Sequence, residues 1–543
     1  MCAPWRGTGF LGALALQLSL ASSPAYAEDA HLAPRLGAAA PAGNLPGKAM
    51  PGFMAMSPAH GVPFTEPAPE APAEPQDGAT PAPSEAKPVP PDASGTAPGE
   101  SDQIAAPALP PVNAALKATL EARSGLPGPV ALLHRREREA IAAFYALRDF
   151  APLWFSGGTG IAAVAPAIER LKHAADDGLD VKGFPLAVSP ATDEEIAAAD
   201  LALSDAVVAY GRQASGSRVD PRMISRLIGV EPEVADPAVI LALVATAGEA
   251  AGEELRRFNP PQKAYEALRE KLLQLRRGRG VAGRDAAIPS GPVLRPGIRT
   301  VAALSGGRSS LEAEILANME RWRWMPRDMG ETHIEVNIPD YEVVVIEKGE
   351  VIERNRVVVG KEQTPTPVFS DTMKFLIVNP AWNVPQSIIR KEMLPRLAAD
   401  PDYLRRMGYE VSSRAGHLVV RQPPGERNAL GRIKFVFPND FSVYMHDTPL
   451  RKLFASAKRA FSHGCVRVDD PFHFAETVLG NGWSEQRIKK LIGGKERYVY
   501  LPKPLPVYLE YFTAFVNESG ELQLRDDVYG YSRRVKAALG LQG

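Results

Sequence analysis

Three neighbouring segments decide the fold: His333-Ile-Glu-Val-Asn-Ile338, Tyr341-Glu-Val-Val-Val-Ile346 and Val351-Ile-Glu-Arg-Asn-Arg-Val-Val-Val359. Each alternates apolar and polar residues and is rich in β-branched side chains, which is the pattern of a half-buried strand. The turn Glu347-Lys-Gly-Glu350 joins two of them as a hairpin. Further strands are expected at 434–437, 442–446, 498–501 and 507–516. The C-terminal part of the chain is therefore predicted to be a largely β domain.

Helical patterns lie inside and before this β domain. A helical stretch at 385–432 interrupts the strands, and an insertion of that size is usually a lid or a partner surface. Residues 112–310 show apolar side chains at helical spacing, for example Tyr265, Leu268 and Leu272. This segment is predicted to be a mostly α module that precedes the β domain.

The N-terminal segment has the composition of a tether behind an export signal. Residues 1–27 contain Arg6, then an apolar run at 10–20, then the small-residue motif Ala25-Tyr-Ala27. This order is typical of a cleaved signal peptide. Of the 51 prolines, 19 fall between Pro34 and Pro111. Residues 28–111 are rich in proline and alanine and poor in aromatic side chains, so they are predicted to be disordered. No later segment has the length and apolar character of a transmembrane helix.

Composition excludes some classes of function. The 543 residues carry 62 Lys and Arg against 63 Asp and Glu, so the net charge of -1 does not predict a nucleic-acid partner. The two cysteines are Cys2 and Cys465, and signal cleavage would remove the first. A single remaining thiol is either buried as a small apolar group or used chemically.

The densest group of chemically active residues surrounds that thiol. It comprises Tyr444-Met-His446 and Phe461-Ser-His-Gly-Cys465-Val-Arg-Val468. A thiol that attacks an acyl carbon must lose its proton, and a nearby imidazole takes it. Spacing leaves both His446 and His463 as candidate bases, because either can lie on the same face as Cys465.

Two further roles follow from the residues around the thiol. The backbone N–H groups of Gly464 and Cys465 are candidates for an oxyanion hole. Arg467 either holds a substrate carboxylate or pairs with Asp469 or Asp470. A zinc site built from the histidines and the cysteine is disfavoured because no zinc spacing motif is present, so no metal and no cofactor are expected.

These residues resemble a known family. Ser462-His-Gly-Cys-Val-Arg467, preceded by His446, resembles the signature of the YkuD-type L,D-transpeptidase catalytic domain. The resemblance extends to the large, lid-bearing subgroup through the segments 362–369, 378–385, 391–395, 403–409 and 444–449. The helical module is similar to the scaffold domain of that subgroup.

The resemblance gives the expected organisation. The fold class is α+β and multidomain: a mainly β YkuD-type catalytic domain with a helical lid, a mostly α scaffold domain, and a disordered tether. The expected segments are a signal peptide at 1–27, a linker at 28–111, the scaffold at 112–310, the catalytic domain at 318–531 with its lid at 385–432, and a tail at 532–543.

The resemblance also implies an activity. Cys465 would attack the stem tetrapeptide of peptidoglycan after its third residue, release D-Ala and form a thioester. The side-chain amine of another stem would then give a 3→3 cross-link. Implied roles are nucleophile for Cys465, base for His446 and oxyanion hole for Gly464, and the implied pocket residues are Tyr444, Ser462, His463, Arg467 and Trp382. The implied partners are peptidoglycan stem peptides and carbapenem inhibitors, and the implied location is the periplasm.

Two departures and two alternatives accompany this hypothesis. Asp447 follows His446 where many relatives have glycine, so a backbone carbonyl is a candidate for orienting the imidazole. No peptidoglycan-binding repeat is found at 276–310. The same thioester resolved by water would make an L,D-carboxypeptidase or an amidase, and an inert Cys465 would make a wall-binding scaffold. The acceptor is a second stem, a lipoprotein lysine or a free D-amino acid.

Overall fold

The computed structural model describes residues 109–124, 135–181, 190–278, 307–414 and 416–541 of the chain. The predicted signal peptide and almost all of the predicted tether lie outside the described residues. No helix in the described ranges combines the length and the apolar character needed to cross a bilayer.

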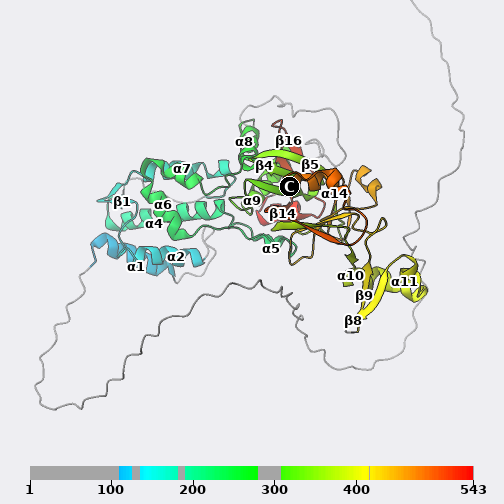
Figure 1. Cartoon of the computed structure of the whole chain (residues 1–543). Helices are drawn as coiled ribbons and strands as arrows, with labels where there is room; N and C mark the ends of the chain where they lie inside the picture. Colours follow the sequence, from blue (N-terminus) through cyan, green and yellow to red (C-terminus); the bar gives the residue numbers. More distant parts are fainter. Residues whose placement is uncertain (1–108, 125–134, 182–189, 279–306, 415, 542–543) are drawn as a thin grey trace, which may run out of the picture. The chain divides into compact units, whose positions relative to one another are not determined.

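The first described part of the chain is helical. Its long helix α4 (Asp193–Ala214) begins at a capping box, in which Thr192 accepts from the Glu195 N–H and the Glu195 side chain reaches back to the Thr192 N–H. Alanines along α4 allow its neighbours to approach closely, and α1, α4 and α6 lie side by side (Figure 1). The other elements are α1 (Pro111–Ser124), α2 (Arg135–Ala146), the β1–β2 hairpin (Phe155–Ser156 and Thr159–Gly160), α3 (Val164–Lys172), α5 (Pro221–Ile224), α6 (Pro237–Thr246), α7 (Ala251–Arg256) and α8 (Lys263–Arg277).

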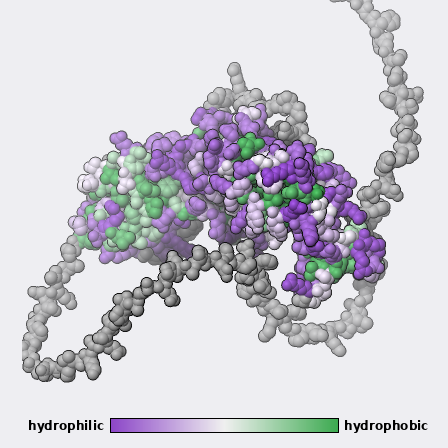
Figure 2. Space-filling model, viewed as in Figure 1, coloured by the Kyte–Doolittle hydropathy of each residue, from purple (hydrophilic) through white to green (hydrophobic). Residues whose placement is uncertain are grey.

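Helix α6 is apolar on more than its buried side. Val239 and Leu243 are 50% and 43% exposed, and hydrophobic residues gather over the helical part of the chain in Figure 2. A separate apolar core joins α8 to the C-terminal part through α9 (Gly307–Trp322). Leu268, Ile315 and Phe512 are all buried in it.

The second part is a β sheet that closes on itself. Strands follow the order β12-β5-β13-β11-β10-β6-β14-β3-β4, and β4 also pairs with β5. The strands are β3 (Thr332–Asn337), β4 (Glu342–Glu347), β5 (Glu350–Gly360), β6 (Phe369–Val378), β10 (Ile433–Val436), β11 (Met445–His446), β12 (Ala460–Ser462), β13 (Val466–Val468) and β14 (Arg497–Glu510). Helices α13 (Pro471–Leu479), α14 (Glu485–Lys489) and α15 (Tyr531–Ala538) and the short pair β15 (Ala514–Val516) and β16 (Leu522–Leu524) complete it.

Strand register sorts the side chains onto two faces. Met445 is paired with Val466 and with Phe435, and all three are fully buried in the main apolar core. Because side chains alternate along a strand, the residues next to them point to the other face. One continuous row on that outer face runs across five strands: Arg467, His446, Lys434, Ile377 and Tyr498.

The insertion between β6 and β10 forms a small unit with its own core. Ile389, Leu404 and Val420 are buried in it. The expectation of a helical lid needs correction, because the segment also contains a three-stranded sheet of order β7-β9-β8. Its elements are β7 (Trp382–Asn383), α10 (Gln386–Ile388), η5 (Ile389–Met393), α11 (Leu394–Ala399), α12 (Tyr403–Arg406), β8 (Glu410–Arg414) and β9 (His417–Gln422). Figure 1 shows α10, α11, β8 and β9 close together.

The expected α+β class is confirmed, and some details differ. The predicted hairpin is present, with Lys348 and Gly349 both at positive φ as its tight turn requires. Strand β6 was not predicted. The predicted tail at 532–543 instead contains most of α15, whose Val535 is fully buried in the main core.

The two parts share backbone contacts and a core. Gly229 donates to the Val368 carbonyl and Val368 donates to the Leu227 carbonyl, both at 2.8 Å. Val219, Ile224 and Ile228 are buried in the same apolar core as the sheet strands. The helical part therefore contributes side chains to the core of the β part.

Candidate active site

Cys465 and His446 come from adjacent parallel strands. His446 ends β11 and pairs with Arg467 of β13, while Cys465 directly precedes β13. The Val466 N–H donates to the Tyr444 carbonyl at 3.1 Å, which holds Cys465 beside Tyr444. By alternation, Tyr444, His446, Cys465 and Arg467 share the outer face of the sheet.

His446 is buried and oriented by the backbone. Its Nδ1 donates to the carbonyl of Asp447 at 2.5 Å, so Nε2 is the nitrogen that can accept a proton. Burial lowers the pKa of His446 to about 3, and the positive charges of Arg467 and Lys434 act in the same direction. The imidazole is therefore neutral near pH 7. A backbone carbonyl orients it, which is the candidate that the sequence offered.

The Asp447 side chain fixes the loop that supplies this carbonyl. Its carboxylate accepts from the Arg432 N–H at 2.8 Å and from the Thr448 N–H at 2.7 Å, and Arg451 lies 3.2 Å away. Gly431 is required beside it because its φ is +63° and a Cβ there would overlap the carboxylate. Asp447 thus anchors the backbone around His446.

The thiol of Cys465 lies beside the Tyr444 hydroxyl, which also faces the Trp382 side chain. Burial raises the pKa of the Cys465 thiol, while contacts with Tyr444 and the charges of Lys434 and Arg467 oppose that rise. The resting pair is therefore a thiol and a neutral imidazole, and the thiolate must form when substrate is present.

The turn before Cys465 is shaped by hydroxyl groups. Ser462 Oγ donates to the Cys465 carbonyl at 2.5 Å and accepts from the Gly464 N–H at 3.1 Å. Thr366 Oγ1 donates to the Gly464 carbonyl at 2.8 Å, and Gly464 has a φ of +122°, which favours glycine. Because the Gly464 N–H already bonds to Ser462, it must change partner to serve an oxyanion. The role predicted for Gly464 stays a prediction.

Two cations flank His446 along the outer row. Lys434 lies over the Tyr444 ring, with its Nζ 3.9 Å from the ring centre, and burial lowers its pKa. Arg467 makes no hydrogen bond or ion pair within the described ranges, and its buried Nε has no acceptor there. Of its two predicted alternatives, pairing with an aspartate does not occur: Asp469 pairs with Arg356 and Arg451, and Asp470 caps α13.

The second histidine faces the lid. The imidazole Nε2 of His463 lies 2.6 Å from the Glu392 carboxylate of η5, and the Lys361 ammonium lies 3.4 Å from the same nitrogen. This contact joins the lid to the segment that carries the thiol. His463 is thus engaged away from the sheet row that contains His446.

The predicted site residues gather in one place, and three others join them. Motif reasoning missed Lys434, Thr366 and Glu392, which reach the site through strand register, a loop and the lid respectively. Lys434 carried a weak signal, since it alternates with Phe435 in a predicted strand. The only described trio with metal-ligand spacing is His473, Glu476 and Glu485, which contains none of the predicted site residues.

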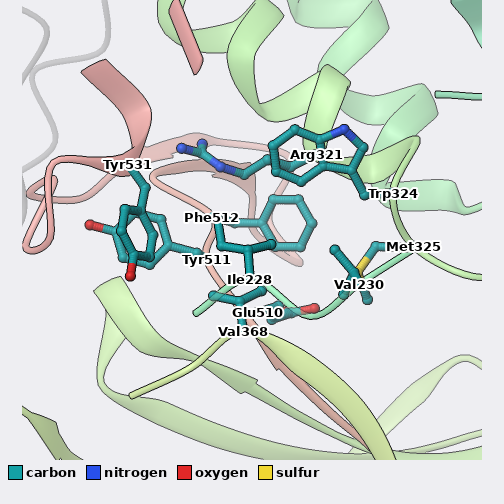
Figure 3. Close-up of a pocket in the computed structure, with 10 residues that line it drawn as sticks. All are labelled: Ile228, Val230, Arg321, Trp324, Met325, Val368, Glu510, Tyr511, Phe512 and Tyr531. Atoms are coloured by element: carbon teal, nitrogen blue, oxygen red, sulfur yellow. The ribbon is translucent and has the colours of Figure 1, made fainter. Parts of the chain in front are cut away.

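The cavity in Figure 3 is not a substrate site. It lies where Ile228 and Val230 meet Glu510 and Tyr511, and its volume is about 20 Å³. That is room for about one water molecule. None of the predicted site residues lines it.

Known proteins are similar to the part of the chain that carries the candidate site. Residues 331–495 match the family model of the YkuD L,D-transpeptidase catalytic domain, and residues 139–272 match that of a Scaffold domain. A curated protein of Haemophilus influenzae that is named as an L,D-transpeptidase is 34% identical over 251 residues, which is 42% of this chain. The match spans 50% of that relative. Residues 331–495 are therefore similar to a YkuD L,D-transpeptidase catalytic domain, which is the similarity that the signature at 462–467 predicted, and residues 139–272 are similar to a Scaffold domain.

Solved structures of the same class were also found. An L,D-transpeptidase from Mycobacterium smegmatis is 15% identical, with a TM-score of 0.18 over 33% of this chain and 58% of that one. The catalytic domain of an E. faecium L,D-transpeptidase acylated by ertapenem is 15% identical, with a TM-score of 0.16 over 34% of this chain and 99% of that one. These scores are too low to carry an argument.

Proposed function

We propose that this protein is a peptidoglycan L,D-transpeptidase that forms 3→3 cross-links through a thioester on Cys465. The observation that carries the proposal is the pairing of β11 with β13, which brings a buried neutral His446 and Cys465 to one face of the sheet. The family match over residues 331–495 supports the same reaction class.

The reaction proceeds in two acyl transfers. His446 Nε2 takes the proton of the Cys465 thiol, and the sulfur attacks the carbonyl carbon of the third stem residue. The tetrahedral intermediate collapses, the C–N bond to D-Ala breaks, and His446 returns the proton to the departing amine. The amine of an acceptor stem then attacks the thioester carbonyl and gives up a proton to His446. The C–S bond breaks, and His446 returns that proton to the sulfur, which restores the Cys465 thiol.

The Arg467 guanidinium is suited to a substrate carboxylate. It is half-buried, it has no anionic partner in the described part of the chain, and it lies beside His446 in the outer row. A carboxylate bound there would offset the positive charge that helps to lower the pKa of His446. The imidazole would then become a better base when the donor is bound.

The lid favours transfer over hydrolysis. The contact between Glu392 and His463 holds it against the Cys465 segment, and a closed lid limits the access of water to a thioester. We place the protein in the periplasm on the strength of its N-terminal sequence, with stem peptides as partners. Carbapenems should acylate Cys465 and block the reaction.

The test is a product analysis with the intact chain. Incubation with disaccharide-tetrapeptide, read by mass spectrometry, should give a dimer that lacks one D-Ala, and Cys465→Ala should give none. Tripeptide alone would indicate a hydrolase or an unsuitable acceptor, and adding a lysine-ended peptide or a free D-amino acid would separate these. A dimer formed by Cys465→Ala would overturn the proposal. A carbapenem adduct on the wild type, absent from the variant, is the matching inhibitor result.

A further inference from the structure

An exposed aromatic surface lies on the same face of the sheet as the candidate site. Tyr498 and Tyr500 of β14 are 57% and 67% exposed, although large aromatic side chains are usually buried. Both contact Phe375 of β6, with ring centres 5.5 and 5.3 Å apart and ring planes tilted by 44° and 49°. We call these three residues the aromatic ledge.

Strand register connects the ledge to His446. Tyr498 pairs with Ile377, Ile377 pairs with Lys434, and Lys434 pairs with His446. Tyr498 is therefore three strands from His446. At about 4.8 Å for each strand spacing, the separation along the sheet is about 14 Å.

The ledge is held in place from both ends. Before it, the Glu496 carboxylate accepts from the Ala381 N–H at 2.9 Å, next to Trp382 of the lid. After it, the pairing of β14 with β6 shifts, so that residues 501–504 stand opposite Lys374 alone. Such bulges commonly re-aim side chains near functional sites. The ledge thus lies between the edge of the lid and a bulge.

We propose that the aromatic ledge binds a sugar ring of the glycan strand that carries the donor stem. This inference rests on the proposed function, because the donor must be a peptidoglycan stem. Three extended residues cover about 10 Å, and the lactyl link to the sugar adds to that reach. Cys465 directly precedes β13, which is one strand farther from the ledge than His446, so the distance to cover along the sheet is about 19 Å. The three stem residues, the lactyl link and the sugar ring cover that distance together.

The charges along the row set the direction of the stem. Arg467 lies at one end of the row and Tyr498 at the other, with Lys434 between them. A terminal D-Ala carboxylate held by Arg467 directs the rest of the stem across Lys434, which suits a carboxylate on a preceding residue. The sugar end then lies over the ledge. Flat ring faces suit the C–H face of a pyranose.

The test compares two ligands and two variants of the intact chain. Binding is measured by calorimetry on the Cys465→Ala protein, with disaccharide-tetrapeptide and with sugar-free tetrapeptide. Replacing Tyr498 and Tyr500 together by Ala should weaken disaccharide-tetrapeptide binding by about tenfold and leave tetrapeptide binding unchanged. Replacing both by Phe, which keeps the rings, should change either Kd by less than about twofold.

Each other outcome overturns the inference. If the double Ala variant bound both ligands more weakly by the same factor, the ledge would contact the peptide or support the fold. If its affinity for disaccharide-tetrapeptide were unchanged, the ledge would not bind the sugar. Altered sedimentation of the double Ala variant would assign it to self-association. Because binding is measured without turnover, failure of the wild type to release D-Ala would sink the proposed function alone.

Discussion

Two groups of buried polar side chains in this molecule differ in how many hydrogen-bond partners they have. In the helical part, Asp200 accepts from the Tyr145 hydroxyl at 2.5 Å and from the N–H groups of Leu153 and Trp154 at 3.0 and 2.7 Å. Ser204 completes that group by bonding to Tyr145 and to the Trp154 indole. In the β part, Arg467 has a buried Nε without an acceptor in the described residues, and Lys434 lies against a ring.

The difference separates structure from chemistry. A buried polar group that is fully bonded within the chain stabilises one conformation, and removing a partner costs free energy. A polar group left incomplete at a surface offers its capacity to a ligand. We therefore expect a variant at Asp200 to change stability. A variant at Cys465, on which the charges of Arg467 and Lys434 act, should instead change activity.

The largest effect is expected from Cys465→Ala. Without the sulfur no thioester forms, so acyl transfer should fall by at least about 10⁴-fold. The thiol is small, so the free energy of unfolding should change by less than about 1 kcal/mol. Product analysis and thermal unfolding check the two halves. Substantial residual transfer would contradict the assignment of the nucleophile.

His446→Gln should lower activity by about 10²- to 10⁴-fold, because the proton transfer loses its base. It should also change the pH dependence of stability. Folding lowers the pKa of His446 from 6.5 to about 3, so the folded state binds fewer protons in that range. The free energy of unfolding should therefore fall as pH drops from about 6.5 towards 3. Chemical denaturation at several pH values should show that the free energy of unfolding falls less steeply below about pH 6.5 in the variant than in the wild type.

Asp200→Ala tests the other side of the comparison. It leaves the N–H groups of Leu153 and Trp154 without their acceptor and the Tyr145 hydroxyl with Ser204 alone, so the free energy of unfolding should fall by about 3 kcal/mol. Activity per folded molecule should be unchanged. The exposed Asp440→Ala is the control and should cost less than about 0.5 kcal/mol. A selective loss of kcat in Asp200→Ala would show that the helical part acts in the reaction.

The smallest effect is expected at the lid. Glu392→Gln weakens the hydrogen bond with His463, which is partly exposed and therefore contributes less than about 1 kcal/mol. Transfer should fall only a few-fold, while the ratio of hydrolysis to transfer should rise because water enters more readily. Quantifying tripeptide against dimer gives that ratio. If the ratio of hydrolysis to transfer were unchanged, the contact between Glu392 and His463 would have no role in excluding water.

Sequence predicted what depends on local pattern. Alternation located β3, β4 and β5. The signature predicts Cys465 and His446 as nucleophile and base, and those roles stay predictions. Strand β6 was missed because its sequence, Phe369-Ser-Asp-Thr-Met-Lys-Phe-Leu-Ile-Val378, mixes polar residues into a strand that pairs on both sides. Lys434, Thr366 and Glu392 were missed because register, loop closure and lid docking bring them to the site from distant segments.

The shared core has a consequence for dissecting the chain. A fragment limited to residues 331–495 would omit β14, which lies between β6 and β3, and would leave two unpaired strand edges that invite aggregation. A fragment that starts at 318 would still strip Val219, Ile224 and Ile228 from the core. Soluble expression of an isolated catalytic piece should therefore require a boundary upstream of Val219 and the retention of α15.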